Sequence, residues 1–167
     1  MTTHLTTPLS LLAGLVAGAA LTALRGRRTV RSLEIDPAYG ILTRSGAERR
    51  LARLRQPLDV VFLDIDHMHR LNAELGYEEA NRLIRLAFQL RRNDAVLVCR
   101  WYSGDEILIL TRSGDGAGLA ERLRTRLASF GLSATIGVVE ATPLRVAIEA
   151  AQGIVMQSKA ARALEVR

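Results

Sequence analysis

The stretch Leu58-Asp-Val-Val-Phe-Leu-Asp-Ile-Asp66 decides how the rest of the chain can fold. Its first six residues, 58–63, form a short and mainly apolar run, which two acids, Asp64 and Asp66, then interrupt. A short apolar run bounded by polar residues is typical of a strand buried within a sheet. The stretch therefore predicts a central strand whose end carries carboxylates.

Further strands are predicted after this one. Two β-rich runs, 95–102 and 107–111, are separated by Ser103-Gly104-Asp105-Glu106, and this turn chemistry suits a hairpin with an acidic tip. Residues 132–139 form a last apolar run of strand length. Four strands with one hairpin favour an antiparallel sheet.

Helical spacing of apolar residues alternates with these strands. It predicts helices over 44–55, over 78–92, around 119–127 and from Thr142-Pro143 onward, where threonine supplies an N-cap and proline suits the first turn. Asp36-Pro-Ala-Tyr-Gly40 reads as a turn that begins the domain. The order of elements predicts an α+β, ferredoxin-like domain, with an antiparallel central sheet and the helices packed on one face.

Length and composition exclude several classes of protein. The 167 residues suffice for one domain and a short extra segment, and 49% apolar residues exclude intrinsic disorder. A single cysteine, Cys99, excludes an internal disulfide and favours a reducing compartment. The net charge of +6 is concentrated in residues 1–31, which leaves 19 basic against 17 acidic groups in the remainder, so nucleic acid is not an expected partner.

The N-terminus predicts a membrane anchor. Residues 8–24 carry no charge and, as a helix, would span about 25 Å, which approaches the roughly 30 Å core of a bilayer. The cluster Arg25-Gly-Arg-Arg28 follows and should stay on the cytoplasmic side. We expect a single-pass anchor at 1–28 in the inner (cytoplasmic) membrane, a linker at 29–35 and a cytoplasmic domain at 36–167. A cleaved signal peptide is the alternative, although residues 1–7 lack the expected lysine or arginine.

Two acids are candidates for metal-dependent phosphoryl or nucleotidyl transfer, which needs carboxylates that hold a divalent cation near phosphates. Asp64 ends the central strand, and Asp105 lies at the tip of a hairpin that should pair with it, next to Glu106. Taken alone, an acid at a strand end is usually a solvated cap, and Gly-Asp in a hairpin is usually only a turn. The sequence contains no phosphate-binding Gly-x-x-x-x-Gly-Lys-Ser/Thr motif and no paired cysteines.

Taken together, the motifs resemble the GGDEF family, the diguanylate cyclases, over about residues 33–165. Five segments carry the likeness in order: DPAYGILTR at 36–44, LDIDHMHRLN at 63–72, YSGDEI at 102–107, SATIG at 133–137, and 151–159 with its terminal lysine. The resemblance implies a palm-like fold that condenses two GTP molecules into cyclic di-GMP. It implies attack by a 3′-hydroxyl on an α-phosphate, with Mg²⁺ or Mn²⁺ as cofactor and a homodimer in which each subunit holds one triphosphate.

The resemblance also implies roles for individual residues. Asp64, the Ile65 carbonyl and Asp105 would bind the metal, and Asp105 and Glu106 would be catalytic, with Glu106 positioning or deprotonating the 3′-hydroxyl. The implied nucleotide-binding residues are Asn72, Asn81, Ser103, Gly104 and Lys159.

The chain departs from the family pattern at several of these positions. Ser103 replaces a glycine, Asn81 an aspartate that accepts hydrogen bonds from guanine, and His69 a lysine. Two alternatives to an active GTP cyclase therefore stay open: a degenerate, non-catalytic nucleotide-binding or dimerisation module, and a cyclase with altered base choice that uses ATP. Arg91-x-x-Asp94 has the letters of the family's product-inhibition site but lies too far upstream, so a salt-paired helix end is the plainer interpretation.

Overall fold

The computed structural model describes residues 34–55, 57–91, 93–102, 104–140 and 143–165. The predicted anchor and Ser103 lie outside these ranges. Within them, no helix is both long and apolar enough to cross a bilayer.

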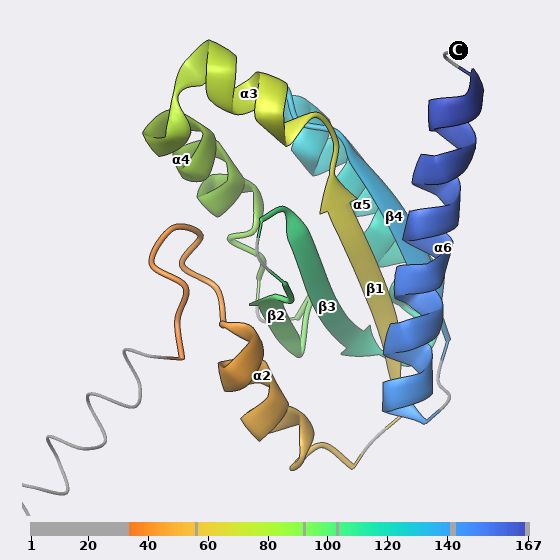
Figure 1. Ribbon diagram of the computed structural model, residues 1–167. Coiled ribbons are helices and arrows are strands. Elements are labelled where there is room, and N and C mark those ends of the chain that lie inside the picture. The colour runs from red at the N-terminus through yellow and green to blue at the C-terminus, as the bar shows by residue number, and fades with distance from the viewer. Residues whose placement is uncertain (1–33, 56, 92, 103, 141–142, 166–167) are drawn as a thin grey trace, which may run out of the picture. The chain divides into compact units, whose positions relative to one another are not determined.

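The sheet has four strands: β1 (Leu58–Ile65), β2 (Leu97–Arg100), β3 (Glu106–Arg112) and β4 (Ala134–Val139). Their order is β2-β3-β1-β4, and every neighbouring pair is antiparallel (Figure 1). This confirms the α+β class, the central position of the first strand and the hairpin. Asp64 lies near the end of this strand, opposite Glu106 on β3 and Thr135 on β4, so the strand end carries a carboxylate as predicted.

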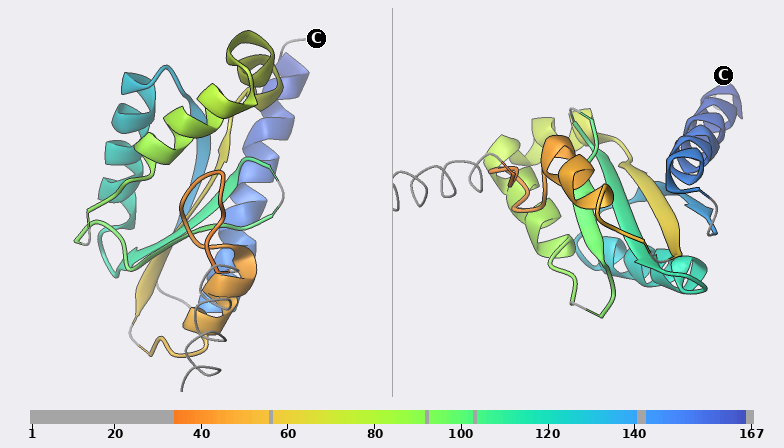
Figure 2. Two further views of the ribbon diagram at one scale, coloured as in Figure 1. Left: turned by 90° about the vertical axis from the view of Figure 1, so that its left-hand side faces the viewer. Right: turned by 90° about the horizontal axis from the view of Figure 1, so that it is seen from below.

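Five helices accompany the sheet in the described residues: α2 (Arg44–Leu51), α3 (Met68–Leu75), α4 (Tyr77–Ala87), α5 (Gly116–Ser129) and α6 (Leu144–Glu165). The expectation that they pack on one face is wrong. One apolar cluster joins Val61 and Leu63 of β1 to residues of α4 and α5, and a second joins Val60 and Phe62 to residues of α2 and α6. Because β1 is apolar at successive positions, both of its faces need cover, and Figures 1 and 2 show α6 and α5 on opposite sides of the sheet.

The helix predicted over 78–92 is shorter than expected, and a separate helix, α3, precedes it. Gly76, with a φ of 79°, separates α3 from α4 because glycine adopts this conformation without steric cost. At the other end, Arg126 of α5 donates to the carbonyls of Leu86 and Ala87 at 2.8 and 2.6 Å. These bonds satisfy helix-end carbonyls that a continuing helix would have used.

Candidate active site

The register of the sheet places two of the predicted acids together. Asp64 on β1 lies directly opposite Glu106 on β3, so their side chains share one face. Neighbouring residues on this face pack against α6. Asp105 immediately precedes β3, and its carbonyl accepts a hydrogen bond from the backbone N–H of Ile65 at 3.2 Å. Three carboxylates therefore meet at one end of the sheet.

Lys159 of α6 reaches the same place, where its ammonium donates to Oδ1 of Asp64. The Asp64 side chain is 16% exposed and that of Lys159 is 33% exposed. Burial raises the pKa of Asp64, and the neighbouring Asp105 carboxylate raises this pKa further, whereas Lys159 lowers it. One ammonium thus faces a group of acids.

Glu106 experiences the same electrostatic environment. Burial is the main cause that raises the pKa of Glu106, and the charges of Asp64 and Asp105 add to it, with Lys159 opposing. Like charges held this close make the site receptive to a further cation.

The residues present fit a magnesium ion. Asp64 and Asp105 offer the hard oxygen ligands that Mg²⁺ prefers, and the Ile65 carbonyl follows Asp64 directly in the chain. The described part of the chain contains no group of three or more His, Cys, Asp or Glu side chains arranged to hold a metal alone. Magnesium is commonly bound by one or two carboxylates together with substrate phosphates.

A second cation, Arg162, belongs to this end of the sheet and was missed from the sequence. Its guanidinium donates to the Thr135 hydroxyl and lies 3.5 Å from Oδ2 of Asp66, while Thr135 donates to Oδ1 of Asp66 at 2.8 Å. The signal was a matched spacing: Arg162 follows Lys159 by three residues on α6, and Asp66, just past the end of β1, follows Asp64 by two.

The predicted base-binding residues lie on neighbouring helices, Asn72 on α3 and Asn81 on α4. The side-chain oxygen of Asn72 is buried and has no hydrogen-bond partner among the described residues. Asn81 lines a hollow of about 420 Å³ together with Pro37, Ala38, Glu78, Arg82 and Arg85. Among the described residues, no hydrogen bond links Asn72 or Asn81 to Asp64, Asp105 or Glu106.

Gly104 forms part of the tight bend before Asp105. Its φ of 105° lies in a region that L side chains rarely adopt, which explains why a glycine stands here. Ser103, its neighbour, is outside the described residues.

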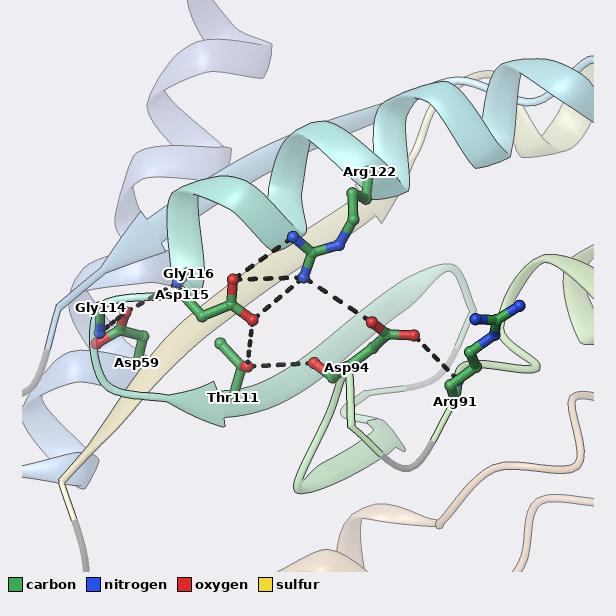
Figure 3. A network of polar contacts seen from close by, with 8 residues as sticks. All are labelled: Asp59, Arg91, Asp94, Thr111, Gly114, Asp115, Gly116 and Arg122. Carbon is green, nitrogen blue, oxygen red and sulfur yellow. Dashed lines mark hydrogen bonds and ion pairs between the residues drawn. The ribbon is translucent and has the colours of Figure 1, made fainter.

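The pair Arg91 and Asp94 has a different arrangement from a salt-paired helix end. Asp94 accepts a hydrogen bond from the backbone N–H of Arg91 at 3.2 Å, and its other oxygen faces Arg122 of α5 at 4.0 Å (Figure 3). Arg122 pairs more closely with Asp115, at 3.1 Å. The ion pair of Asp94 is therefore made with α5, which was not predicted.

Known proteins resemble this chain both in sequence pattern and in fold. The family model described as "Diguanylate cyclase, GGDEF domain" matches residues 41–164. The coiled coil and GGDEF domain of DgcB from Caulobacter crescentus, solved with c-di-GMP, has a TM-score of 0.75 at 18% identity and covers 91% of this chain and 94% of its own. Diguanylate cyclase SiaD from Pseudomonas aeruginosa, solved with its activator SiaC, has a TM-score of 0.63 at 19% identity, covering 92% and 68%. No curated protein sequence gives a significant match. At these identities the solved structures establish a shared fold.

Proposed function

Because the chain belongs to the GGDEF family of diguanylate cyclases, we propose that it condenses two GTP molecules into cyclic di-GMP. The 3′-hydroxyl of one nucleotide attacks the α-phosphate of the other and pyrophosphate leaves. The observation that carries the proposal is the meeting of Asp64, Asp105 and Glu106 with Lys159 at one end of the sheet.

In this proposal each charged residue has one task. Asp64, Asp105 and the Ile65 carbonyl hold Mg²⁺ or Mn²⁺, which when bound neutralises charge on the phosphates. Glu106 accepts the proton of the attacking hydroxyl, and its raised pKa makes it a better base than an exposed glutamate. When the Asp64 carboxylate binds the cation, the Lys159 ammonium leaves it and pairs with phosphate oxygens instead.

The nucleotide would be held by the bend at Ser103 and Gly104 and by the two asparagines. Asn72 has a buried, unpartnered oxygen within the described residues, which suits it to accept a hydrogen bond from a base. Asn81 carries a neutral amide that both donates and accepts, whereas a carboxylate only accepts. This observation favours the second candidate function, a cyclase that also accepts ATP.

Two further parts of the proposal concern assembly. Each subunit holds one triphosphate, so catalysis requires two subunits facing each other as a homodimer. Residues 8–24 anchor the chain in the inner (cytoplasmic) membrane with the domain in the cytoplasm, which would raise the effective concentration of subunits for pairing.

Product analysis tests this proposal. The full chain is incubated separately with each of the four triphosphates and Mg²⁺ or Mn²⁺, and products are identified by mass. We expect cyclic di-GMP from GTP, and loss of about a thousandfold in rate for Asp105→Asn. Asp115→Asn, the same chemical change at the start of α5, is the matched control and should keep the wild-type rate.

The other outcomes discriminate between the candidates. Full activity in Asp105→Asn would exclude the proposed site. Triphosphate binding without product from any nucleotide would identify the degenerate module, and cyclic di-AMP from ATP would identify altered base choice.

A further inference from the structure

Two donors from separate parts of the chain converge on one backbone oxygen beside the acids. The carbonyl of Gly104 accepts a hydrogen bond from the Tyr39 hydroxyl at 3.1 Å and one from Nε of Arg100 at 2.7 Å. Gly104 immediately precedes Asp105, so this carbonyl belongs to the peptide that leads into the candidate metal ligand.

These two donors are themselves fixed in place. The Tyr39 side chain is 1% exposed, and the Arg100 guanidinium lies 4.3 Å from the centre of its ring. Arg100 also donates to Oδ2 of Asp36 at 3.1 Å, and the other Asp36 oxygen accepts the backbone N–H groups of Ala38 and Tyr39. The turn at 36–40 is held from its other side by Arg85, which donates to the carbonyls of Pro37 and Ala38.

The peptide at Gly104 needs such restraint. A Cβ built on Gly104 would meet nothing within 4 Å, so packing around this residue does not limit its rotation. Glycine has the greatest backbone freedom of any residue. Glu106 is fixed by the pairing of β3 with β1, and the Asp105 carbonyl is held by Ile65. The peptide on the amino side of Asp105 precedes β3 and depends on the bend.

We propose that Tyr39 is a positioning residue: its hydroxyl, together with Arg100, fixes the Gly104 carbonyl and so orients the Asp105 carboxylate toward Asp64. The role of Asp105 as a metal ligand rests on the proposed function, whereas the contacts of Tyr39 and Arg100 with Gly104 do not. The ring of Tyr39 serves the apolar core, whereas the hydroxyl serves the bend. Removing the hydroxyl oxygen alone would therefore test the contact with the bend and leave the ring in the core.

The test removes that atom. Tyr39→Phe keeps the ring under Arg100 and deletes the hydroxyl, and Tyr77→Phe makes the same deletion on a side chain of α4 that is 74% exposed. Arg100→Lys removes the Nε–H donor and the planar guanidinium while keeping a positive charge beside Asp36. All are made in the full chain.

Two readouts do not depend on turnover. Trp101 is the only tryptophan, is 7% exposed, and donates its backbone N–H to the Glu106 carbonyl at 2.9 Å, so its fluorescence reports on the bend. We expect easier quenching by acrylamide in Tyr39→Phe and Arg100→Lys without metal. We also expect Mn²⁺ affinity, measured by electron paramagnetic resonance with a non-hydrolysable GTP analogue, to fall about tenfold, and no change in Tyr77→Phe.

Turnover supplies a third readout. In Tyr39→Phe we expect kcat to fall about tenfold, because the Asp105 carboxylate is less well oriented. Unchanged quenching and unchanged Mn²⁺ affinity in both variants would overturn the positioning role. A wild-type chain without turnover would instead overturn the proposed function, and the quenching result would still decide the role of Tyr39.

Discussion

Strand β1 carries two aspartates, Asp59 and Asp64, with contrasting surroundings. Asp59 is 1% exposed, and its Oδ2 accepts the backbone N–H groups of Gly114 and Gly116, both at 2.9 Å (Figure 3). Its carboxylate thus lies at the N-terminus of α5, where the helix dipole favours negative charge. Asp64, five residues later, pairs with an ammonium and faces two further carboxylates.

The contrast shows that burial alone does not identify a functional acid. The more buried aspartate has backbone donors and serves the fold. The pKa of the less buried one is raised by its partial burial and, beyond that, by the like charge of Asp105. A group of acids that opposes its own ionisation costs stability, and such groups are typical of functional sites. The partners of a carboxylate, and not its exposure, separate the two roles.

The largest effect should come from Asp64→Asn. We expect the rate of cyclic dinucleotide formation to fall about a thousandfold, because a neutral amide is a poor ligand for the cation that the site needs. The free energy of unfolding should change by less than about 1 kcal/mol, since the ion pair with Lys159 is partly exposed. Product assays and urea titration measure both, and a residual rate within tenfold of wild type would remove the contrast with Asp59.

Asp59→Ala should produce the opposite pattern. Removing the acceptor leaves two backbone N–H groups at the start of α5 without their partner, which should lower the free energy of unfolding by about 2–4 kcal/mol. Turnover per folded molecule should stay at the wild-type level. Asp59→Asn keeps an acceptor oxygen and should lose less; an equal loss in both would mean that the charge, and not the hydrogen bonds, stabilises α5.

Close packing beneath α5 gives a third, smaller effect. A Cβ at Gly116 would lie 2.9 Å from Cβ of Asp59 and 2.9 Å from Cγ1 of Val138, so Gly116→Ala should lower the free energy of unfolding by about 1–3 kcal/mol. Gly153→Ala in α6 meets nothing within 4 Å and should instead stabilise by about 0.5–1 kcal/mol. Thermal unfolding of both variants checks the pair, and similar values would contradict the packing argument.

The two aspartates also show what the sequence could predict. Local patterns predicted the strand around Asp64 and the hairpin that carries Asp105, and pairing of these elements then brings the acids together. The role of Asp59 could not be predicted from the sequence. Its partners are backbone N–H groups 55 and 57 residues away, and no pattern of side chains indicates where backbone groups lie. The end of α4 was missed for the same reason, since Arg126 of another helix binds its last carbonyls.

The smallest effect, and the most specific, concerns the pH dependence of stability. The pKa values of Asp64 and Glu106 are raised above their ordinary 3.8 and 4.5 in the folded protein. At pH values between the ordinary and the raised pKa, the folded state therefore binds more protons than the unfolded chain. The free energy of unfolding falls across that range and stays lower above it.

Glu106→Gln should remove part of this penalty. Because Glu106 lies directly opposite Asp64, the variant loses a like-charge cross-strand pair and should be more stable than wild type by about 0.2–1 kcal/mol at neutral pH. The gain should vanish at acidic pH, where both carboxyls are protonated in wild type. Glu121→Gln on α5 removes an acid that pairs favourably with Arg124, so it should give no gain at any pH. Urea titrations across the acidic to neutral range measure the difference, and a gain that persists in acid would show that packing, and not charge, distinguishes Glu106.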